Sequence, residues 1–339
     1  MYILGFESSC DETSAAVVYT DGKQKKILSD IIASQIETHK LYGGVVPEIA
    51  SRAHIEAISR ITVRALDEAQ LKISDIDCIA VTACPGLIGA LLVAVNFAKS
   101  LAYANNIPLV AVNHIHAHTA AVFTEYEELE PPLLSLAVSG GNTAFFRVKD
   151  PVTYEFIGGT RDDAAGEAFD KIGRVIGLPY PSGAAMDKLA RLGDPNAIKL
   201  PSPALSGDTL DFSFSGLKTA MLNYINSQTQ KGADISALSA DIAASYTKAI
   251  VTGIAKKVDE ALKLTGEKKM VLCGGVAANS QQRAAVREAC QKNGATLYMP
   301  PVSLCGDNGA MVAMQGYFEF MAGKRASLDL NASAVHVEL

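Results

Sequence analysis

The sequence is poor in cysteine and lacks the long apolar runs of membrane proteins. Its six cysteines, in 339 residues, include no C-x-x-C pair, which argues against a disulfide framework or a zinc ribbon and favours a reducing, cytoplasmic setting. The longest apolar run, residues 87–98, contains Asn96 and is followed by Lys99, so it is too short to span a bilayer. Residues 1–7 have no basic leader, and we expect them to form a first strand and not a signal peptide.

Charge is also sparse. Charged residues make up 19% of the sequence and the net charge is −6, so any RNA binding must be local or shared with a partner. The phosphate-binding strings G-x-x-x-x-G-K-[ST] and G-x-G-x-x-G are both absent. A hydrophobic content of 49% excludes a disordered chain, and the length corresponds to about two domains.

What the sequence does contain is an internal repeat. Asp307 lies 189 positions after His118 (307 − 118 = 189), and the same offset places residues 84–86 on 273–275 and residues 108–112 on 297–301. We therefore interpret the chain as two copies of one unit. The helix that carries the histidines and a helix beginning at Asp307 would be equivalent, and their metal-type ligands could converge where the copies face each other.

Each copy is predicted to follow the order βββαβαβα. In the first copy we expect strands at residues 2–6, 14–19, 27–36, 78–83 and 109–112, and helices from 47, at 87–105 and from 114. In the second copy we expect strands at 133–138, 143–148, 153–157, 270–273 and 296–299, and helices at 235–264, 279–292 and 307–321. The stretch between the third strand and the long helix carries helix signals at 166–176 and 182–192, followed by a Pro-, Ser- and Gly-rich segment at 201–216.

This order predicts an α/β protein with a duplicated ribonuclease-H-like fold, as in the actin, Hsp70 and sugar-kinase (ASKHA) superfamily, with two lobes and a central nucleotide cleft. The expected domains are an N-terminal actin-like lobe at 1–130, a C-terminal actin-like lobe at 131–325 with a helical insertion at about 160–234, and a C-terminal tail at 326–339. Since open sheets bind ligands at the carboxyl ends of their strands, we expect the turns there to carry the chemistry.

His114 and His118 are four residues apart, so on a helix both imidazoles face one side and can hold a single cation. With Asp307 they would form a two-histidine, one-carboxylate set with open positions, which suits Fe(II) or catalytic Zn(II). His116 points elsewhere on the helix and is the poorest candidate. The alternative interpretation is an ordinary pair of surface or core histidines that binds no metal. The offset that relates His118 to Asp307 favours metal binding over this alternative.

Four Gly- and Ser-rich turns follow predicted strands, at residues 7–12, 139–143, 158–160 and 274–279. Glycine lets backbone N–H groups approach phosphate oxygens closely, and helix N-termini favour negative charge. One such turn would more simply be a tight hairpin, but four at equivalent strand ends favour a nucleotide cleft. Nearby carboxylates could hold ribose hydroxyls, position a metal or accept a proton, although two of them (Asp11 and Glu12) could equally cap a turn. These acidic residues are Glu7, Asp11, Glu12, Asp170 and Asp187.

Several longer strings resemble the TsaD family, formerly labelled O-sialoglycoprotein endopeptidase, and the resemblance runs nearly end to end. The strings are ESSCDET at 7–13, YGGVVPE at 42–48, PGLIGAL at 85–91, the His-x-x-x-His pair, VSGG at 138–141, GEAFDK at 166–171, FSFSGLK at 212–218 and GGVAAN at 274–279.

The resemblance implies an enzyme that transfers the threonylcarbamoyl group from L-threonylcarbamoyladenylate to N6 of adenosine 37 in tRNAs that read ANN codons, with release of AMP. It implies one divalent metal ion, Fe(II) or Zn(II), held by His114, His118 and Asp307. We add the hypothesis that Glu12, with Asp11, deprotonates the adenosine amine. The adenylate contacts implied by the resemblance are Ala137, Val138, Ser139, Gly140, Gly141, Asp170, Gly183, Asp187 and Asn279.

The resemblance also implies partners: tRNA, a TsaB-like paralogue, a TsaE-like ATPase and a synthase that makes the labile adenylate, with no membrane. Three positions depart from the family pattern. Asn142 and His116 stand where many relatives have histidine and glutamate, and Gly306 stands where threonine is common. All three ligands are retained, so the departures leave open the choice of metal and the orientation of the substrate.

Three other functions were weighed against this one. A metalloprotease of the H-E-x-x-H kind needs a glutamate where this chain has Ile115. A kinase or ATPase of the same superfold would release ADP, whereas a carbamoyl transferase releases AMP. A catalytically silent scaffold would have no need of the three ligand residues.

Overall fold

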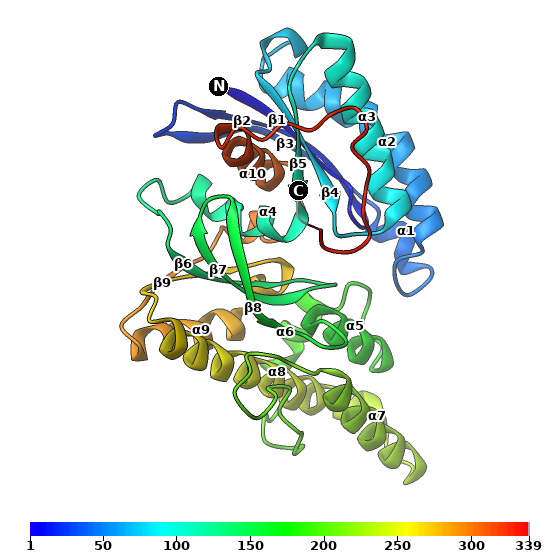
Figure 1. Cartoon of the computed structure of the whole chain (residues 1–339). Helices are drawn as coiled ribbons and strands as arrows, with labels where there is room; N and C mark the ends of the chain where they lie inside the picture. Colours follow the sequence, from blue (N-terminus) through cyan, green and yellow to red (C-terminus); the bar gives the residue numbers. More distant parts are fainter. Residues whose placement is uncertain (338–339) are drawn as a thin grey trace. The chain divides into compact units, whose positions relative to one another are not determined.

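The computed structural model describes residues 1–337, which form two compact units (Figure 1). Unit 1 comprises Met1–Pro131, Lys149–Tyr154 and Pro300–Leu339, and unit 2 comprises Pro132–Val148 and Glu155–Met299. Each unit contains one five-stranded sheet with its own covering helices.

The sheet of unit 1 has the order β3-β2-β1-β4-β5. The first three strands pair antiparallel, whereas β4 pairs parallel to β1 and β5 parallel to β4. Because parallel strands end on the same edge of a sheet, the last residues of β1, β4 and β5, namely Glu7, Cys84 and Asn113, lie along one edge. The strands are β1 (Tyr2–Glu7), β2 (Glu12–Thr20), β3 (Lys25–Ser34), β4 (Cys78–Cys84) and β5 (Leu109–Asn113).

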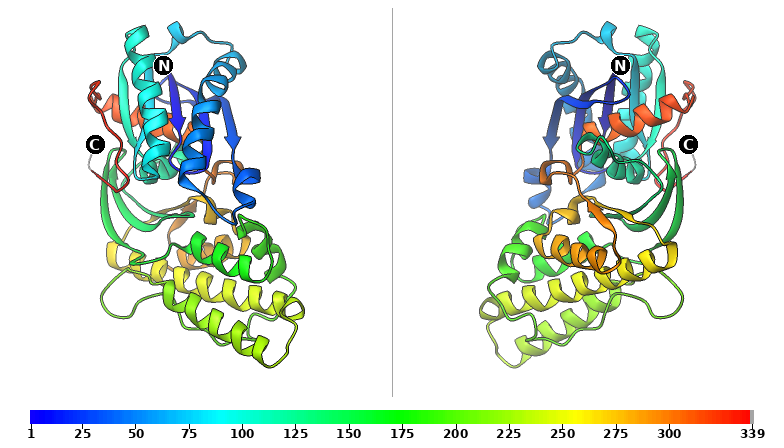
Figure 2. Two further views of the ribbon diagram at one scale, coloured as in Figure 1. Left: turned by 90° about the vertical axis from the view of Figure 1, so that its right-hand side faces the viewer. Right: turned by 90° about the vertical axis from the view of Figure 1, so that its left-hand side faces the viewer.

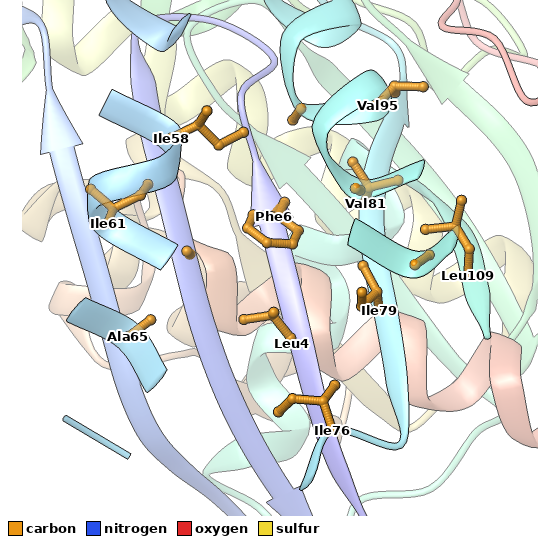
Figure 3. Packing of buried hydrophobic residues seen from close by; sticks show 14 of the residues in the cluster. Leu4, Phe6, Ile58, Ile61, Ala65, Ile76, Ile79, Val81, Val95 and Leu109 are labelled. Atoms are coloured by element: carbon orange, nitrogen blue, oxygen red, sulfur yellow. The ribbon is translucent and has the colours of Figure 1, made fainter. Parts of the chain in front are cut away.

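Two long helices, α2 (Pro47–Glu68) and α3 (Ile88–Asn105), cover one face of this sheet. Alternate residues of β1 and β4 point into the core between them, and Figure 3 shows Leu4, Phe6 and Val81 in one cluster with Ile58 of α2 and Val95 of α3. The alternation follows from the two-residue period of a strand. Shorter helical segments of the unit are α1 (Ile36–Lys40), η1 (Ile73–Asp75), α4 (His114–Ala120), η2 (Ala121–Thr124) and η4 (Val302–Leu304).

The opposite face of the same sheet is covered by α10 (Gly309–Met321), which packs on β1, β2 and β4 (Figure 1). This contact is close because it is made through glycines. A Cβ atom on Gly5 would lie 2.5 Å from the backbone nitrogen of Ala313, and one on Gly309 would lie 2.6 Å from that of Ala16. The start of α10 is therefore held against the centre of the sheet.

Unit 2 repeats the strand order of unit 1, running β10-β9-β6-β7-β8. In both sheets the first strand lies between its hairpin partner and the fourth strand, so the predicted duplication is confirmed at the level of topology. The pair β6–β9 and the pair β9–β10 are parallel, and β6–β7 is antiparallel. The strands are β6 (Leu133–Val138), β7 (Thr143–Asp150), β8 (Thr153–Gly159), β9 (Lys269–Cys273) and β10 (Thr296–Tyr298).

The helices of unit 2 pack around the long helix α8, which contacts four others. It begins after the N-cap Asp234, whose carboxylate accepts from Ser236 N, and ends at Gly266 with a φ of 70°. Figure 2 shows α7, in yellow-green, running alongside it. These helices are α5 (Ala165–Val175), α6 (Gly183–Ala190), α7 (Ser215–Gln230), α8 (Ile235–Thr265), η3 (Gly275–Ala278) and α9 (Ser280–Lys292).

The structure differs from the sequence-based expectation in the start of α10, in the unit to which residues 300–325 belong, and in two further helices. Helix α10 begins at Gly309 and not at Asp307, because Asn308 is its N-cap and accepts from Met311 N at 2.8 Å. The segment 300–325 groups with unit 1, whereas the sequence placed it in the second lobe, and the glycine-mediated packing of α10 on β1 is the reason. Helices α1 and α7 were not predicted.

One helix among the described residues is long and apolar enough to cross a membrane, judged by length and composition alone. It is α3, with a mean hydropathy of 1.3. Because α3 packs on α2 and β4 as a core helix of unit 1, and core helices of globular proteins often meet the same criteria, this is weak evidence for a membrane span.

Candidate metal centre and nucleotide-binding turns

Helix α4 presents two histidines directly after strand β5. Asn113, the last residue of β5, is the N-cap, and its Oδ1 accepts from Ile115 N at 2.9 Å and from His116 N at 3.3 Å. The four-residue spacing puts the rings of His114 and His118 on one face, edge to face with centroids 4.7 Å apart. Both are buried, with 5% and 1% of their surface exposed, so neither is an ordinary surface histidine.

Asp307 meets both imidazoles from the segment just before α10. Its Oδ1 lies 3.2 Å from His118 Nε2 and 3.6 Å from His114 Nε2. All three residues belong to unit 1, so the expectation that the acid and the imidazoles come from different lobes is wrong. The reason is the packing of α10 on the first sheet, which brings Asp307 to the strand edge where α4 begins.

These three residues fit a divalent cation. The three ligand atoms lie within 4.8 Å of one another. Of the two separations from Asp307, 3.2 Å lies within the roughly 3–3.5 Å expected between atoms that share one ion at bond lengths near 2.1 Å, and 3.6 Å lies just outside it. Both ring nitrogens of His118 are buried and make no well-aligned hydrogen bond. Buried polar atoms without a partner cost free energy, so such atoms are rare in folded proteins. A cation shared by the three groups would satisfy the Nε2 atom.

His114 is oriented by a carboxylate behind it. Its Nδ1 lies 3.0 Å from Glu7 Oε2 and 3.1 Å from Ser9 Oγ, which leaves Nε2 pointing at Asp307. Thr82 Oγ1 donates to the same Glu7 oxygen at 2.6 Å, and Ser9 N donates to the other oxygen. A carboxylate bonded to the far nitrogen of an imidazole is the usual support of a metal-binding histidine.

The electrostatics of the cluster also favour a cation. Burial alone would raise the pKa of Glu7, but the neighbouring His114 lowers it below its usual range. Burial alone would lower the pKa of His114, but Glu7 and Asp307 raise it to about 9. For Asp307, burial opposes ionisation, yet His114 and His118 hold its pKa near 2. The buried carboxylate of Glu7 and the half-buried carboxylate of Asp307 are thus stabilised by positive charge between them, which a metal ion supplies with release of a proton.

Glu12 and Asp11 lie in the same unit, at the start of β2. Burial, followed by the charges of Asp307 and Asp11, raises the pKa of Glu12 to about 9, while Ser34 Oγ donates to its Oε1. Asp11 is 8% exposed. Without a cation Glu12 therefore holds a proton at neutral pH. A positive charge beside Asp307 would lower that pKa, so that Glu12 would be ionised at neutral pH and able to accept a proton.

In unit 2, the turns after β6 and β9 lie side by side because these strands are parallel, with Ala137 opposite Cys273. Two glycines are required here. Gly274 has a φ of 89°, and its Cβ would lie 2.5 Å from Val138 O; a Cβ on Gly166 would lie 2.6 Å from Ser139 O. The turn 139–142 is closed by the Ser139 N–H, which donates to Asn142 O at 2.7 Å.

Hydrogen bonds link the other predicted adenylate contacts in unit 2. Asp170 Oδ1 accepts from Ser182 N at 2.6 Å, next to Gly183 at the start of α6. Asp187, on α6, accepts from Ser280 Oγ at 2.9 Å and pairs with Arg191. Ser280 follows Asn279, the N-cap of α9. The site residues predicted from the sequence thus fall into two groups. The predicted adenylate contacts lie in unit 2, and the three predicted metal ligands lie with Glu7 in unit 1.

Several supporting residues were not predicted from the sequence. The sequence singled out Glu7 only as an acidic residue near a turn, and Ser9 only as part of the 7–12 string. Thr82 and Asn113 were not singled out at all; Asn113 ends a short apolar run, which is a usable signal, whereas Thr82 lies inside the run 78–84 and has none. The structure places all four around α4.

The fold has likenesses among solved structures. The chain aligns with full-length HypF in its phosphate- and nucleotide-bound form at a TM-score of 0.60 and 17% identity, covering 99% of this chain and 47% of HypF. It aligns with the ROK hexokinase from Thermus thermophilus at a TM-score of 0.50 and 17% identity, covering 95% of this chain and 100% of the hexokinase. With its two sheets of one strand order, the chain is an ASKHA-type, duplicated ribonuclease-H-like protein that carries an imidazole–carboxylate centre.

The sequence comparison is more specific. A family model described as TsaD, tRNA N6-adenosine threonylcarbamoyltransferase, matches residues 26–314. Proteins of that name from Clostridium botulinum (strain 657 / Type Ba4) and Clostridioides difficile (strain 630) are 51% and 49% identical over 330 and 329 residues, covering 97% of this chain and 96% of each relative. The chain therefore belongs to the TsaD family, and the resemblance found in its sequence is confirmed.

Proposed function

We propose that the chain transfers the threonylcarbamoyl group of L-threonylcarbamoyladenylate to N6 of adenosine 37 in tRNAs that read ANN codons. The adenosine amine attacks the carbamoyl carbonyl carbon, so that a new N–C bond forms while the C–O bond to the phosphate breaks. AMP leaves, and the proton of the amine passes to a base. The observation that carries this proposal is the match to the TsaD family over residues 26–314.

The cofactor in this proposal is one divalent metal ion, Fe(II) or Zn(II), held by His114, His118 and Asp307. When bound, such an ion supplies Lewis-acid stabilisation to a carbonyl or phosphate oxygen. Glu7 and Ser9 keep His114 in the orientation that exposes its Nε2, so the protein has no need to reorganise before reaction.

The adenylate is proposed to bind in unit 2, along the turns of Ala137–Gly141 and at the N-terminus of α9. A glycine-containing turn, which lets a phosphate approach the backbone closely, and a helix N-terminus favour a phosphate there. The amide of Asn279 and the carboxylates of Asp170 and Asp187 are proposed contacts, together with Val138, Ser139, Gly140 and Gly183.

Glu12 is proposed to accept the proton of the amine, with Asp11 as its neighbour. The charge of Asp307 helps to raise the pKa of Glu12, so a cation bound beside Asp307 would lower that pKa. The remaining assignments rest on family membership alone: a TsaB-like paralogue and a TsaE-like ATPase as protein partners, tRNA as the acceptor, and a cytoplasmic location.

The decisive experiment incubates the purified chain, with its partners, with tRNA transcript and threonylcarbamoyladenylate. The tRNA is then digested to nucleosides and analysed by mass spectrometry, and the nucleotide product is identified. We expect threonylcarbamoyladenosine and AMP in equal amounts. ADP with a phosphorylated acceptor would establish a kinase in its place, and cleavage of a glycoprotein that stops on chelation would establish a protease.

A further inference from the structure

The chain that follows α10 runs back across unit 1 as an extended strap, which we define as residues 326–337. Its apolar side chains Leu330 and Ala332 pack against the core cluster of the unit, and Figure 1 shows the strap in red beside α3. Hydrogen bonds along its length attach it, among them Ala326 N to Leu109 O (2.7 Å), Lys99 Nζ to Leu330 O (2.9 Å), Ser333 N to Ala83 O (2.9 Å) and Gly86 N to Ala334 O (3.3 Å).

The strap ends on the N-cap of the histidine helix. Asn113 Nδ2 donates to His336 Nδ1 at 2.7 Å and lies 3.6 Å from Cys84 Sγ. The His336 ring also meets the ring of His116 edge to face, with centroids 5.7 Å apart. A residue more than 200 positions away in the sequence thus contacts the residue immediately before His114.

This contact decides which way the amide of Asn113 points. The cap requires its oxygen to face Ile115 N and His116 N, so its NH₂ group needs an acceptor on the other side. His336 Nδ1 is that acceptor, which requires the His336 tautomer protonated on Nε2. The Cys84 sulfur, which Asn113 Nδ2 also reaches at 3.6 Å, is a weaker acceptor.

Helix α4 depends on such a cap. It has seven residues, far fewer than a helix needs for stability on its own, so its first turn is held by Asn113 and by packing. His114 is the first residue of that turn, so a rotated Asn113 would loosen the backbone that carries His114, whose ring would then be held only by Glu7 and Ser9.

We propose that His336 is a positioning residue of the metal centre: it locks the amide of Asn113, and through it the first turn of α4, in the geometry that binds the cation. This inference rests on the metal site proposed above. It assigns to the strap a role in metal affinity, although no strap residue is itself a ligand.

The test compares His336→Ala, His336→Asn and His336→Gln in the full chain. An asparagine oxygen can take the place of Nδ1, whereas a glutamine oxygen falls near the place of Nε2. Since His336 is exposed, all three variants should fold. Val335→Ala, an exposed neighbour on the strap, is the matched control.

Two readouts are measured without substrates: Zn(II) affinity by competition with a chromophoric chelator, and hydrogen exchange of the amides of residues 114–118. We expect His336→Ala and His336→Gln to weaken Zn(II) binding about 10-fold, as removal of an outer partner of a metal site typically does. Their α4 amides should exchange faster, while His336→Asn and Val335→Ala stay close to the parent.

Unchanged affinity and exchange in His336→Ala would overturn the proposal. Equal losses of Zn(II) affinity in His336→Asn and His336→Gln would also overturn it. A strap that contributed only side-chain volume would not distinguish these two variants. If the parent chain bound no metal, the proposal of a metal cofactor would be wrong. The hydrogen-exchange rates of α4 in the parent and in the His336 variants would still show whether His336 holds the N-cap.

Discussion

At the scale of single residues, His118 is the ligand with the fewest other contacts. It is buried, and neither ring nitrogen has a well-aligned hydrogen bond, although Nε2 lies 3.2 Å from Asp307 Oδ1, a position that suits a shared cation. We predict that His118→Ala lowers Zn(II) or Fe(II) affinity by at least about 100-fold, the upper end of what loss of an outer partner causes. Metal analysis after dialysis measures this, and tRNA modification should be lost in parallel.

His116→Ala is the control for that variant. It lies on the same helix, but its ring stacks on Tyr154 with centroids 3.8 Å apart and planes within 4°. We expect this variant to keep its metal, although loss of the stacking should reduce stability. If His116→Ala lost as much metal as His118→Ala, metal binding would depend on the integrity of α4 and not on the imidazole of His118.

Asp30 gives a pH dependence that is separate from the metal ligands. Burial raises the pKa of Asp30 from 3.8 to about 6, although hydrogen bonds from Ser14 and the backbone of Gly309 oppose the shift. The folded chain therefore keeps a proton that the unfolded chain releases. The resulting contribution to stability is complete below about pH 4 and is lost as the pH rises through about 6.

Asp30→Asn should remove this dependence, because asparagine is neutral at every pH and its oxygen can accept the same two hydrogen bonds. We predict that the variant gains on the parent chain between pH 4 and 7, by up to roughly 3 kcal/mol. Urea unfolding at several pH values measures the difference. A difference between the two proteins that is constant over this range would contradict the assignment to Asp30.

At the scale of elements, the contact between β1 and α10 sets the place of Asp307. Because a Cβ on Gly5 would meet backbone atoms of α10, which cannot rotate away, Gly5→Ala must push the helix from the sheet. We predict a loss of about 1–3 kcal/mol in the free energy of unfolding, together with weaker metal binding. Gly44→Ala, where a Cβ meets nothing within 4 Å, is the control and should be nearly neutral.

The elements also show what the sequence could and could not predict. Alternating and helical apolar periods located all ten strands seen in the described chain, because burial on one or both faces leaves a local pattern. Helix α7 was missed since its N-terminus is capped by Asp162, whose carboxylate accepts from Phe214 N and Ser215 N about fifty residues along the chain. A cap supplied from so far away leaves no local signal.

The site was predictable to a similar degree. Spacing and the internal offset named His114, His118 and Asp307, which the structure brings together. The orientation of His114 by Glu7, and of Asn113 by His336, depends on chain segments that meet only after folding. Sequence periodicity carries no information on such pairs, so the residues that support the ligands are evident only in the folded structure.

At the scale of the whole molecule, duplication explains the ligand set but not its location. His118 follows the fifth strand of the first copy and Asp307 the fifth strand of the second, as the offset of 189 (307 − 118) indicates. Yet the last helix of the second copy packs on the sheet of the first, so equivalent positions of the two copies meet inside unit 1. The repeat is symmetric in strand order and asymmetric in where its final helix lies.

This asymmetry predicts which part of the molecule a metal stabilises. A ligand that binds only the folded state adds about 2.7 kcal/mol at a free concentration 100 times its Kd, and all three ligands belong to unit 1. Chelation should therefore speed hydrogen exchange in β1, β5 and the first turn of α10, while β6 and β9 of unit 2 exchange as before. His118→Ala should not respond to the chelator at all. Equal acceleration in both units would contradict this prediction, because the free energy of metal binding would then stabilise both units. That result would be expected if Asp307 were held by the sheet of unit 2 and the histidines by the sheet of unit 1.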